Sequence, residues 1–304
     1  MAAAIKDGVR RLVRPGPGAA STVANARDLF EQIAGDLRHN FNGVNSGDSE
    51  AIHQFHIAIG RMRALLELYR PALHKQWYAK QREEVRFFAH TIGGLRDTDI
   101  LQETLRDAAL TIEVLSDALG PLHQMLTEQR RRKHKELCSL VTSPRFEGLV
   151  SSIPTAPFSP AVSENSSPRD LIRPLVRKVK RAGAKLSRDS SPREFHRLRV
   201  RIKRLRYVLE MLNSKKTTRT ARVVKKLKDA QEVLGFQHDG ITAMTWLYET
   251  AESGNVSGPT CLAAGTVYEV LHQRSIDASV RAWKKWKGMR HRCHFKSCMK
   301  ALRA

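Results

Sequence analysis

Apolar residues recur every three or four positions through most of the chain, which is the period of an amphipathic α-helix. The pattern is clearest in residues 191–212, where about 100° per residue gathers the apolar side chains on one side of a helix. These apolar residues are Leu198, Leu205, Val208, Leu209 and Leu212. Ser191 is placed to cap this helix, with Pro192 as its first residue and Glu194 completing a capping box. The stretch therefore predicts one helix that packs one face against a core.

The same pattern predicts helices in both halves of the chain. Their ranges are 25–38, 49–70, 75–91, 99–119 and 122–141, followed by 169–185, 191–212, 219–234, 240–252 and 261–288. Gly93-Gly94 and Gly120-Pro121 are interpreted as helix stops, and 42–49 as a loop. Because no stretch alternates with period two for long enough to be a strand, the sequence predicts an all-α fold.

The second half repeats the first. Arg27-Asp28-Leu29 returns as Arg169-Asp170-Leu171, and the segment 92–97 returns as 234–239, at an offset of 142 residues in both cases. This repeat divides the chain into a flexible basic leader (1–24), a first helical bundle (25–150), a Pro/Ser-rich linker (151–168) and a second bundle (169–304). The two bundles are expected to form one module about a pseudo-two-fold axis, with their basic helices facing each other across one groove.

Charge narrows the range of partners. The chain has 53 Lys and Arg against 30 Asp and Glu, a formal net charge of +23. Such a surplus favours a polyanionic partner: nucleic acid, an anionic membrane surface or an inorganic phosphate polymer. Aromatic residues make up only 6% of the chain, which disfavours base-stacking surfaces. No run approaches the roughly 18 apolar residues of a membrane span, and four cysteines form no disulfide framework, so we expect a cytoplasmic protein.

The best candidate site is the polar face of the 191–212 helix. His196, Arg199, Lys203 and Arg206 follow one another at i, i+3, i+7 and i+10 and share one narrow sector. Arginine and lysine spaced along a helix suit successive phosphates of a polymer. The alternative is a solvated charged face, but the face recurs in the first half and few acids neutralise it. Two denser basic runs, one at 130–135 and one at 225–228, rank below it because such runs are usually solvated.

Three other groups are weaker candidates. Asp97 and Asp99 could form a metal or acid/base pair, but a helix stop followed by an Asp N-cap is the favoured interpretation. His53 and His56 could bind a metal, although the second repeat keeps only one histidine of this pair, so a role as phosphate donor is preferred. The tail residues Cys293, His294 and Cys298 match no zinc spacing that we can justify.

These motifs resemble the CHAD family, the conserved histidine α-helical domain. Its motif, roughly His-x-x-Arg, three residues, then basic-Arg-x-Arg, is matched in the second repeat by His196, Arg199, Lys203, Arg204 and Arg206, followed by Tyr207. In the first repeat His53, Arg61 and Arg63 match, whereas His56 and Gly60 stand where the family usually has basic residues. The resemblance covers nearly all of the chain from about residue 25. It implies two pseudo-symmetric four-helix bundles around a basic central channel that binds inorganic polyphosphate without catalysis.

We therefore predict a non-catalytic polyphosphate-binding module without cofactor or metal, located in the cytoplasm and compatible with polyphosphate granules. The expected binding residues are His53, His56, Arg61, Arg63, Arg96, His196, Arg199, Lys203, Arg204, Arg206, Lys225 and Lys228. Arg61 and Arg204 lie off the main sector and are expected to flank the groove or to pair with acids. The alternatives are a nucleic-acid-binding protein and a metal-dependent phosphohydrolase that uses Asp97 and Asp99.

Overall fold

The regular structure of the described residues is helical. The computed structural model describes residues 22–111, 117–158, 168–212 and 218–291. Within these ranges the only strand-like feature is an isolated bridge between Leu73 and Phe158. The predicted all-α fold is therefore confirmed.

The first half contains six α-helices in its described residues: α1 (Thr22–His39), α2 (Phe41–Ser46), α3 (Ser49–Tyr69), α4 (Lys75–Ala109), α5 (Gly120–Val141) and α6 (Pro144–Ser152). The described second half contains α8 (Pro168–Ala184), α9 (Pro192–Leu212), α10 (Thr218–Glu252) and α11 (Gly258–His291). The halves match in length, since α3 and α9 have 21 residues each and α4 and α10 have 35 each. Their packing order matches as well: α1 packs on α3, α3 on α4 and α4 on α5, while α8 packs on α9, α9 on α10 and α10 on α11.

The predicted helix stops at the glycine–aspartate segments are wrong. Helix α4 continues through Gly93 and Gly94, and α10 continues through Gly235 and Gly240. A glycine costs a helix interior only about 1 kcal/mol relative to alanine. Both helices bury apolar residues before and after these glycines, and that burial outweighs the local cost. The predicted loop at 42–49 is also partly wrong, because α2 fills most of it before Gly47 turns the chain with φ +79° and Asp48 caps α3.

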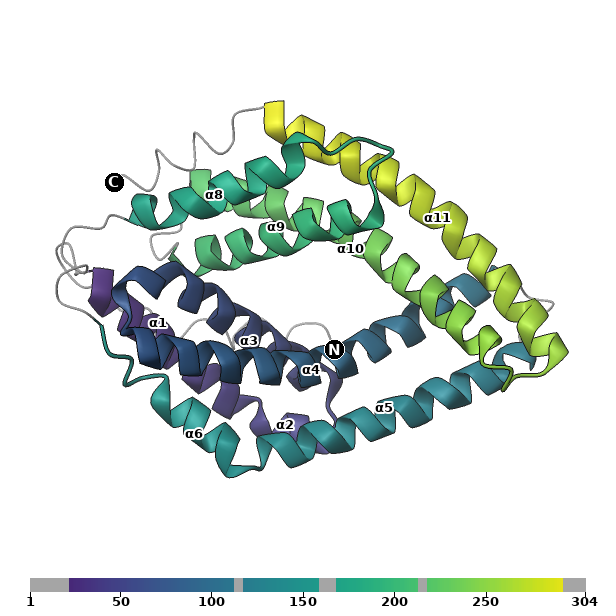
Figure 1. Cartoon of the computed structure of the whole chain (residues 1–304), viewed down its shortest axis with the longest axis horizontal. Coiled ribbons are helices and arrows are strands. Elements are labelled where there is room, and N and C mark those ends of the chain that lie inside the picture. The colour runs from purple at the N-terminus through teal and green to yellow at the C-terminus, as the bar shows by residue number, and fades with distance from the viewer. Residues whose placement is uncertain (1–21, 112–116, 159–167, 213–217, 292–304) are drawn as a thin grey trace, which may run out of the picture.

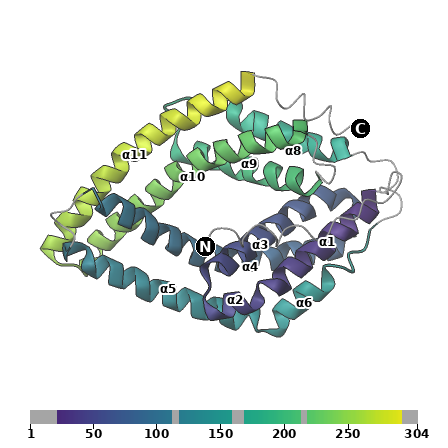
Figure 2. The ribbon, with the colours of Figure 1, turned by 180° about the vertical axis from the view of Figure 1, so that it is seen from behind.

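In the described ranges, two separate hydrophobic cores hold the helices together. The larger core joins α1, α3, α8 and α9 to one end of α4, α5, α10 and α11. The smaller core lies where the other ends of the same four long helices meet. Figures 1 and 2 show the four long helices running from the α3–α9 region to that distant meeting point. The cores are thus joined by helix segments that contribute to neither of them.

The segment predicted as a linker begins with packed structure. Ile153 is buried, and the Phe158 ring lies 6.1 Å from that of Phe30 and 6.2 Å from that of Tyr69. Helix α1 likewise begins at Thr22, inside the range predicted as leader. Residues 1–21 and 159–167 lie outside the described part of the chain.

Candidate functional site

Charged residues gather in the helix segments between the two cores. On α4 the larger core ends at Leu95 and the smaller begins at Leu101, and on α10 the corresponding limits are Leu234 and Ala243. The charged residues between these limits, together with polar faces of α3, α5 and α9, form what we call the central cluster. Its members are His53, His56, Arg63, Arg96, Asp97, Lys133, His196, Arg199, Lys203, Arg206, His238 and Asp239. The charge of each member shifts the pKa of another member, or its own pKa is shifted by the charge of another member.

The two repeats meet where α3 crosses α9. Lys203 Nζ lies 3.0 Å from His56 Nε2. Burial, reinforced by Lys203, lowers the pKa of His56 to about 3, so its neutral imidazole accepts the hydrogen bond from the ammonium. Burial and the neighbouring Arg199 lower the pKa of Lys203 to about 8. The helices approach closely here because Gly60 has no side chain: a Cβ at that position would lie 2.8 Å from Cε2 of Tyr207. The space at Gly60 is therefore filled by Tyr207.

Arg199 stands at the middle of the cluster. It makes no ion pair with a carboxylate of the described residues, and its buried Nε lacks a hydrogen-bond partner there. Its charge nevertheless acts on groups from both repeats. It lowers the pKa of His56 and His238, and it opposes the rise in the pKa of Asp97 and Asp239. A guanidinium with these neighbours is available to an anionic ligand.

Histidines and carboxylates surround this guanidinium. The rings of His196 and His238 lie 4.4 Å apart, and burial is the main cause that lowers the pKa of both, for His238 to about 4. Burial raises the pKa of Asp239 to about 6 and also raises that of Asp97. The Asp97 side chain is exposed to solvent, yet desolvation by the surrounding protein is the main cause of its raised pKa. This combination is expected of a side chain on a concave wall.

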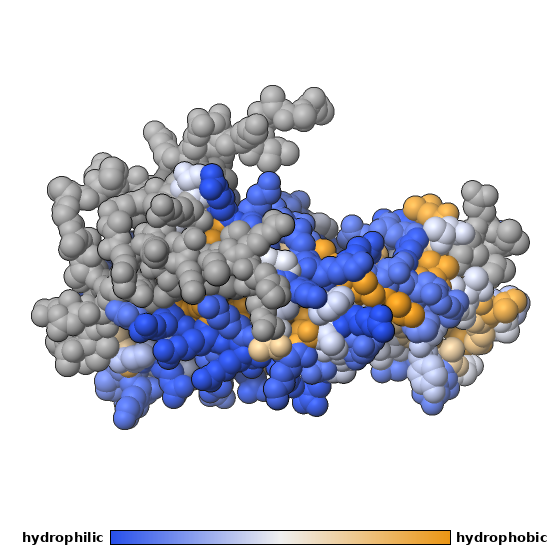
Figure 3. Space-filling view, turned by 90° about the horizontal axis from the view of Figure 1, so that it is seen from above, coloured by the Kyte–Doolittle hydropathy of each residue, from blue (hydrophilic) through white to orange (hydrophobic). Residues whose placement is uncertain are grey.

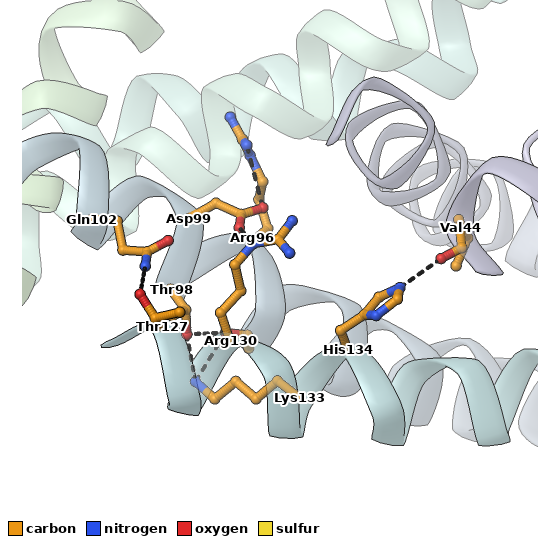
Figure 4. A network of polar contacts seen from close by, with 10 residues as sticks. Val44, Arg96, Thr98, Asp99, Gln102, Thr127, Arg130, Lys133 and His134 are labelled. Atoms are coloured by element: carbon orange, nitrogen blue, oxygen red, sulfur yellow. Dashed lines mark hydrogen bonds and ion pairs between the residues drawn. The ribbon is translucent and has the colours of Figure 1, made fainter. Parts of the chain in front are cut away.

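Polar contacts between α4 and α5 fix one side of the cluster (Figure 4). Lys133 Nζ donates to the carbonyl of Gly94 and to Oγ1 of Thr98, both at 2.9 Å. Arg130 Nε donates to Asp99 at 2.7 Å, and Arg96 lies 3.7 Å from the same carboxylate. Asp99 therefore pairs with two arginines from inside a continuous helix, and its predicted role as an N-cap, like that of Asp97, is wrong.

The structure groups most of the residues expected to bind polyphosphate. Those in the central cluster are His53, His56, Arg63, Arg96, His196, Arg199, Lys203 and Arg206. Arg61 and Arg204 pair with acids as expected, Arg61 with Asp36 at 3.6 Å and Arg204 with Glu67. Lys225 and Lys228 are exposed on the N-terminal half of α10, and the structure does not group them with the cluster.

Sequence reasoning missed Lys133, His238 and Asp239. The internal repeat carried a signal for the last two, because its offset of 142 residues relates Arg96 to His238 and Asp97 to Asp239. Lys133 belongs to a basic run of the kind that is usually solvated, and only the approach of α5 to Gly94 distinguishes it from its neighbours.

The described residues contain no group of three or more His, Cys, Asp or Glu side chains arranged to hold a metal ion. None of the helices in this part of the chain combines the length and the apolar character that a bilayer crossing requires. The tail residues Cys293, His294 and Cys298 lie outside the described ranges.

One family model matches most of the chain. The family model of the CHAD domain matches residues 28–248. Two curated relatives, the uncharacterized proteins MT2285 and Rv2226 of Mycobacterium tuberculosis (strains CDC 1551 / Oshkosh and ATCC 25618 / H37Rv), are each 23% identical over 242 residues. The match covers 74% of this chain, and the chain spans 45% of the length of either relative.

Solved structures show the same fold. PptA from Streptomyces chartreusis superposes with a TM-score of 0.73 at 18% identity, covering 87% of this chain and 100% of that one. The CHAD domain from the plant Ricinus communis superposes with a TM-score of 0.69 at 21% identity, covering 87% of this chain and 91% of that one.

Proposed function

The chain belongs to the CHAD-domain family, and on this premise we propose that its central cluster binds inorganic polyphosphate without catalysing a reaction. The observation that carries the proposal is the set of cations around Arg199. In the described residues, neither Arg199 nor Lys203 pairs with a carboxylate, although helices of both repeats surround them. Holding these charges together without a directly paired carboxylate costs free energy, and a polyanion would offset that cost.

The arrangement suits a chain of phosphates better than a single anion. Arg199, Lys203 and Arg206 follow one side of α9, whereas Arg63, Arg96 and Lys133 come from α3, α4 and α5. Cations distributed over four helices can contact several phosphates of one extended chain, each by charge-assisted hydrogen bonds. We propose that these side chains line the basic central channel that the family resemblance implies. A cytoplasmic location, polyphosphate granules included, is compatible with this role.

Charge-neutralising substitutions test the proposal. Arg199→Gln with Lys203→Gln removes two cluster cations and creates no repulsion with Glu210, the partner of Arg206. We expect the affinity for long-chain polyphosphate to fall at least about tenfold, since each charge-assisted contact contributes roughly 1.5–3 kcal/mol. Helix content, measured by circular dichroism, should stay the same.

The matched control is Lys80→Gln with Arg82→Gln, which removes the same charge from exposed positions of α4. Unchanged binding by the cluster variant, or an equal loss in both variants, would contradict the site assignment. Displacement of polyphosphate by duplex DNA at equal phosphate concentration would favour the nucleic-acid alternative. Release of phosphate from polyphosphate in the presence of Mg²⁺ or Mn²⁺ would favour the hydrolase.

A further inference from the structure

The α8–α9 hairpin is far more basic than its counterpart in the first repeat. Residues 170–201 contain eleven Lys and Arg against three Asp and Glu. The equivalent residues 28–58 contain one Lys or Arg against five Asp and Glu. The first repeat builds the same pair of packed helices with acidic residues, so the fold does not require these arginines. They therefore point to a function outside folding.

The excess arginines lie in two rows on the outside of the hairpin. Arg173, Arg177 and Arg181 of α8 are exposed at a spacing of four residues. Arg193, Arg197 and Arg201 of α9 have the same spacing, with the first two exposed and Arg201 partly so. Four helical residues correspond to a rise of about 6 Å, so each row presents guanidinium groups at regular intervals. We call these six residues the outer arginine face.

The two rows run side by side. Nη1 of Arg201 donates to the carbonyl of Lys178 at 3.2 Å, which fixes the register of the antiparallel helices. The nearby carboxylate of Glu67 is already used, since it accepts from Lys178 at 2.5 Å and from Arg204. In the described part of the chain, no member of the outer arginine face forms an ion pair with Asp or Glu.

Helix α9 connects this face to the central cluster. His196 belongs to the cluster, whereas Arg193 and Arg197, within one turn of it, belong to the outer arginine face. A linear polyanion that leaves the cluster at the N-terminal end of α9 would meet these arginines next. Figure 3 views the molecule from above Figure 1, where hydrophilic side chains cover much of the coloured surface and apolar ones appear in separate patches between them.

We propose that the outer arginine face is a second polyphosphate-binding surface, which holds the part of a long chain that extends beyond the central cluster. This inference rests on the proposed function. A short oligophosphate contacts the cluster alone, whereas a long chain contacts both surfaces and gains affinity from the additional contacts. The protein thereby distinguishes polyphosphates by length.

The test compares tripolyphosphate with long-chain polyphosphate in titration calorimetry. The variant Arg177→Gln, Arg181→Gln, Arg197→Gln should bind the long chain at least about tenfold more weakly, with a shallower dependence on salt, because fewer counterions are released. Its affinity for tripolyphosphate should equal that of the unmodified protein. The control Lys75→Gln, Lys80→Gln, Arg82→Gln removes the same charge from exposed positions of the first repeat and should retain the long-chain affinity.

The outcomes separate this inference from the proposed function. If the unmodified protein binds neither phosphate, the proposed function fails. If it binds both, but the outer variant keeps its long-chain affinity or loses both affinities equally, the second surface is overturned and the central site stands. A further experiment measures the binding of the same variants to vesicles containing phosphatidylserine. Loss of vesicle binding in the outer variant with unchanged long-chain binding would assign the face to a membrane and overturn the proposal.

Discussion

Nζ of Lys203 on α9 lies 3.0 Å from Nε2 of His56 on α3, where the two repeats are in contact. The internal repeat relates Lys203 to Gly60 and His56 to Arg199, so the two helices contribute unequal charge to the crossing. With the pKa of His56 lowered to about 3, the imidazole is neutral at physiological pH. The charge at this crossing therefore comes from α9.

Polyphosphate binding should strengthen as the pH falls. An anion raises the pKa of the groups near it, so binding takes up protons wherever a group is deprotonated in the free protein and protonated in the complex. For Lys203 this window begins at its pKa of about 8 and extends upward, and for Asp239 it extends upward from about 6. We expect at least about tenfold tighter binding at pH 6 than at pH 9.5, measured by calorimetry in two buffers of different ionisation enthalpy.

Lys203→Arg supplies the control for this pH dependence. Arginine keeps its charge up to pH values above 12, so the change between pH 8 and 9.5 should disappear. The part between pH 6 and 8 should persist, because Asp239 is unchanged. A flat profile in the unmodified protein, or proton release on binding, would contradict the prediction.

Two glycines inside helices should respond to alanine in opposite directions. A Cβ at Gly60 would lie 2.8 Å from Cε2 of Tyr207, a residue only 3% exposed, whereas a Cβ at Gly93 would meet nothing within 4 Å. Gly60→Ala should therefore destabilise the protein by about 1–3 kcal/mol through overpacking. Gly93→Ala should stabilise it by about 0.5–1 kcal/mol through helix propensity. Urea unfolding measures both values.

A second background shows whether Tyr207 causes the loss. In a Tyr207→Leu protein, Gly60→Ala should cost much less than in the unmodified protein, because the ring that a Cβ would meet is gone. Equal costs in both backgrounds would refute the packing argument. A destabilising Gly93→Ala would show that α4 is not a regular helix at that residue.

The sequence predicted the helical class and the helix at 191–212, because local signals determine these features. The backbone amide of Ser191 donates to Oε2 of Glu194 at 2.9 Å, which is the glutamate half of a capping box, and the Ser191 hydroxyl donates to the same oxygen at 3.0 Å. The helix stops at Gly93-Gly94 and in 234–240 were wrong for a tertiary reason. Each of these glycines lies between segments that join different cores, and no local pattern shows that both cores hold one continuous helix.

The site was predictable along α9 and less so around it. A helical period places His196, Arg199, Lys203 and Arg206 on one face, and the structure keeps them in one cluster. The contribution of Lys133 depends on how α5 passes Gly94, a contact between residues 39 positions apart in the chain. The conditional charge of Lys203 likewise depends on burial that the helical period does not encode.

The stability of the ligand-free protein should depend on pH through Asp239. Burial raises its pKa to about 6 from an ordinary value of 3.8. A raised pKa means that the group favours folding fully below pH 3.8, and that this contribution is lost as the pH rises through 6. Asp239→Asn, which resembles the protonated acid, should therefore stabilise the protein at pH 7.5 by on the order of 1–2 kcal/mol and have little effect at pH 4.

The exposed Asp277→Asn serves as the control and should change the free energy of urea unfolding little at either pH. Were Asp239→Asn destabilising at pH 7.5, the carboxylate would be a favourable partner of Arg199, and the cluster would already be neutralised before any polyanion binds.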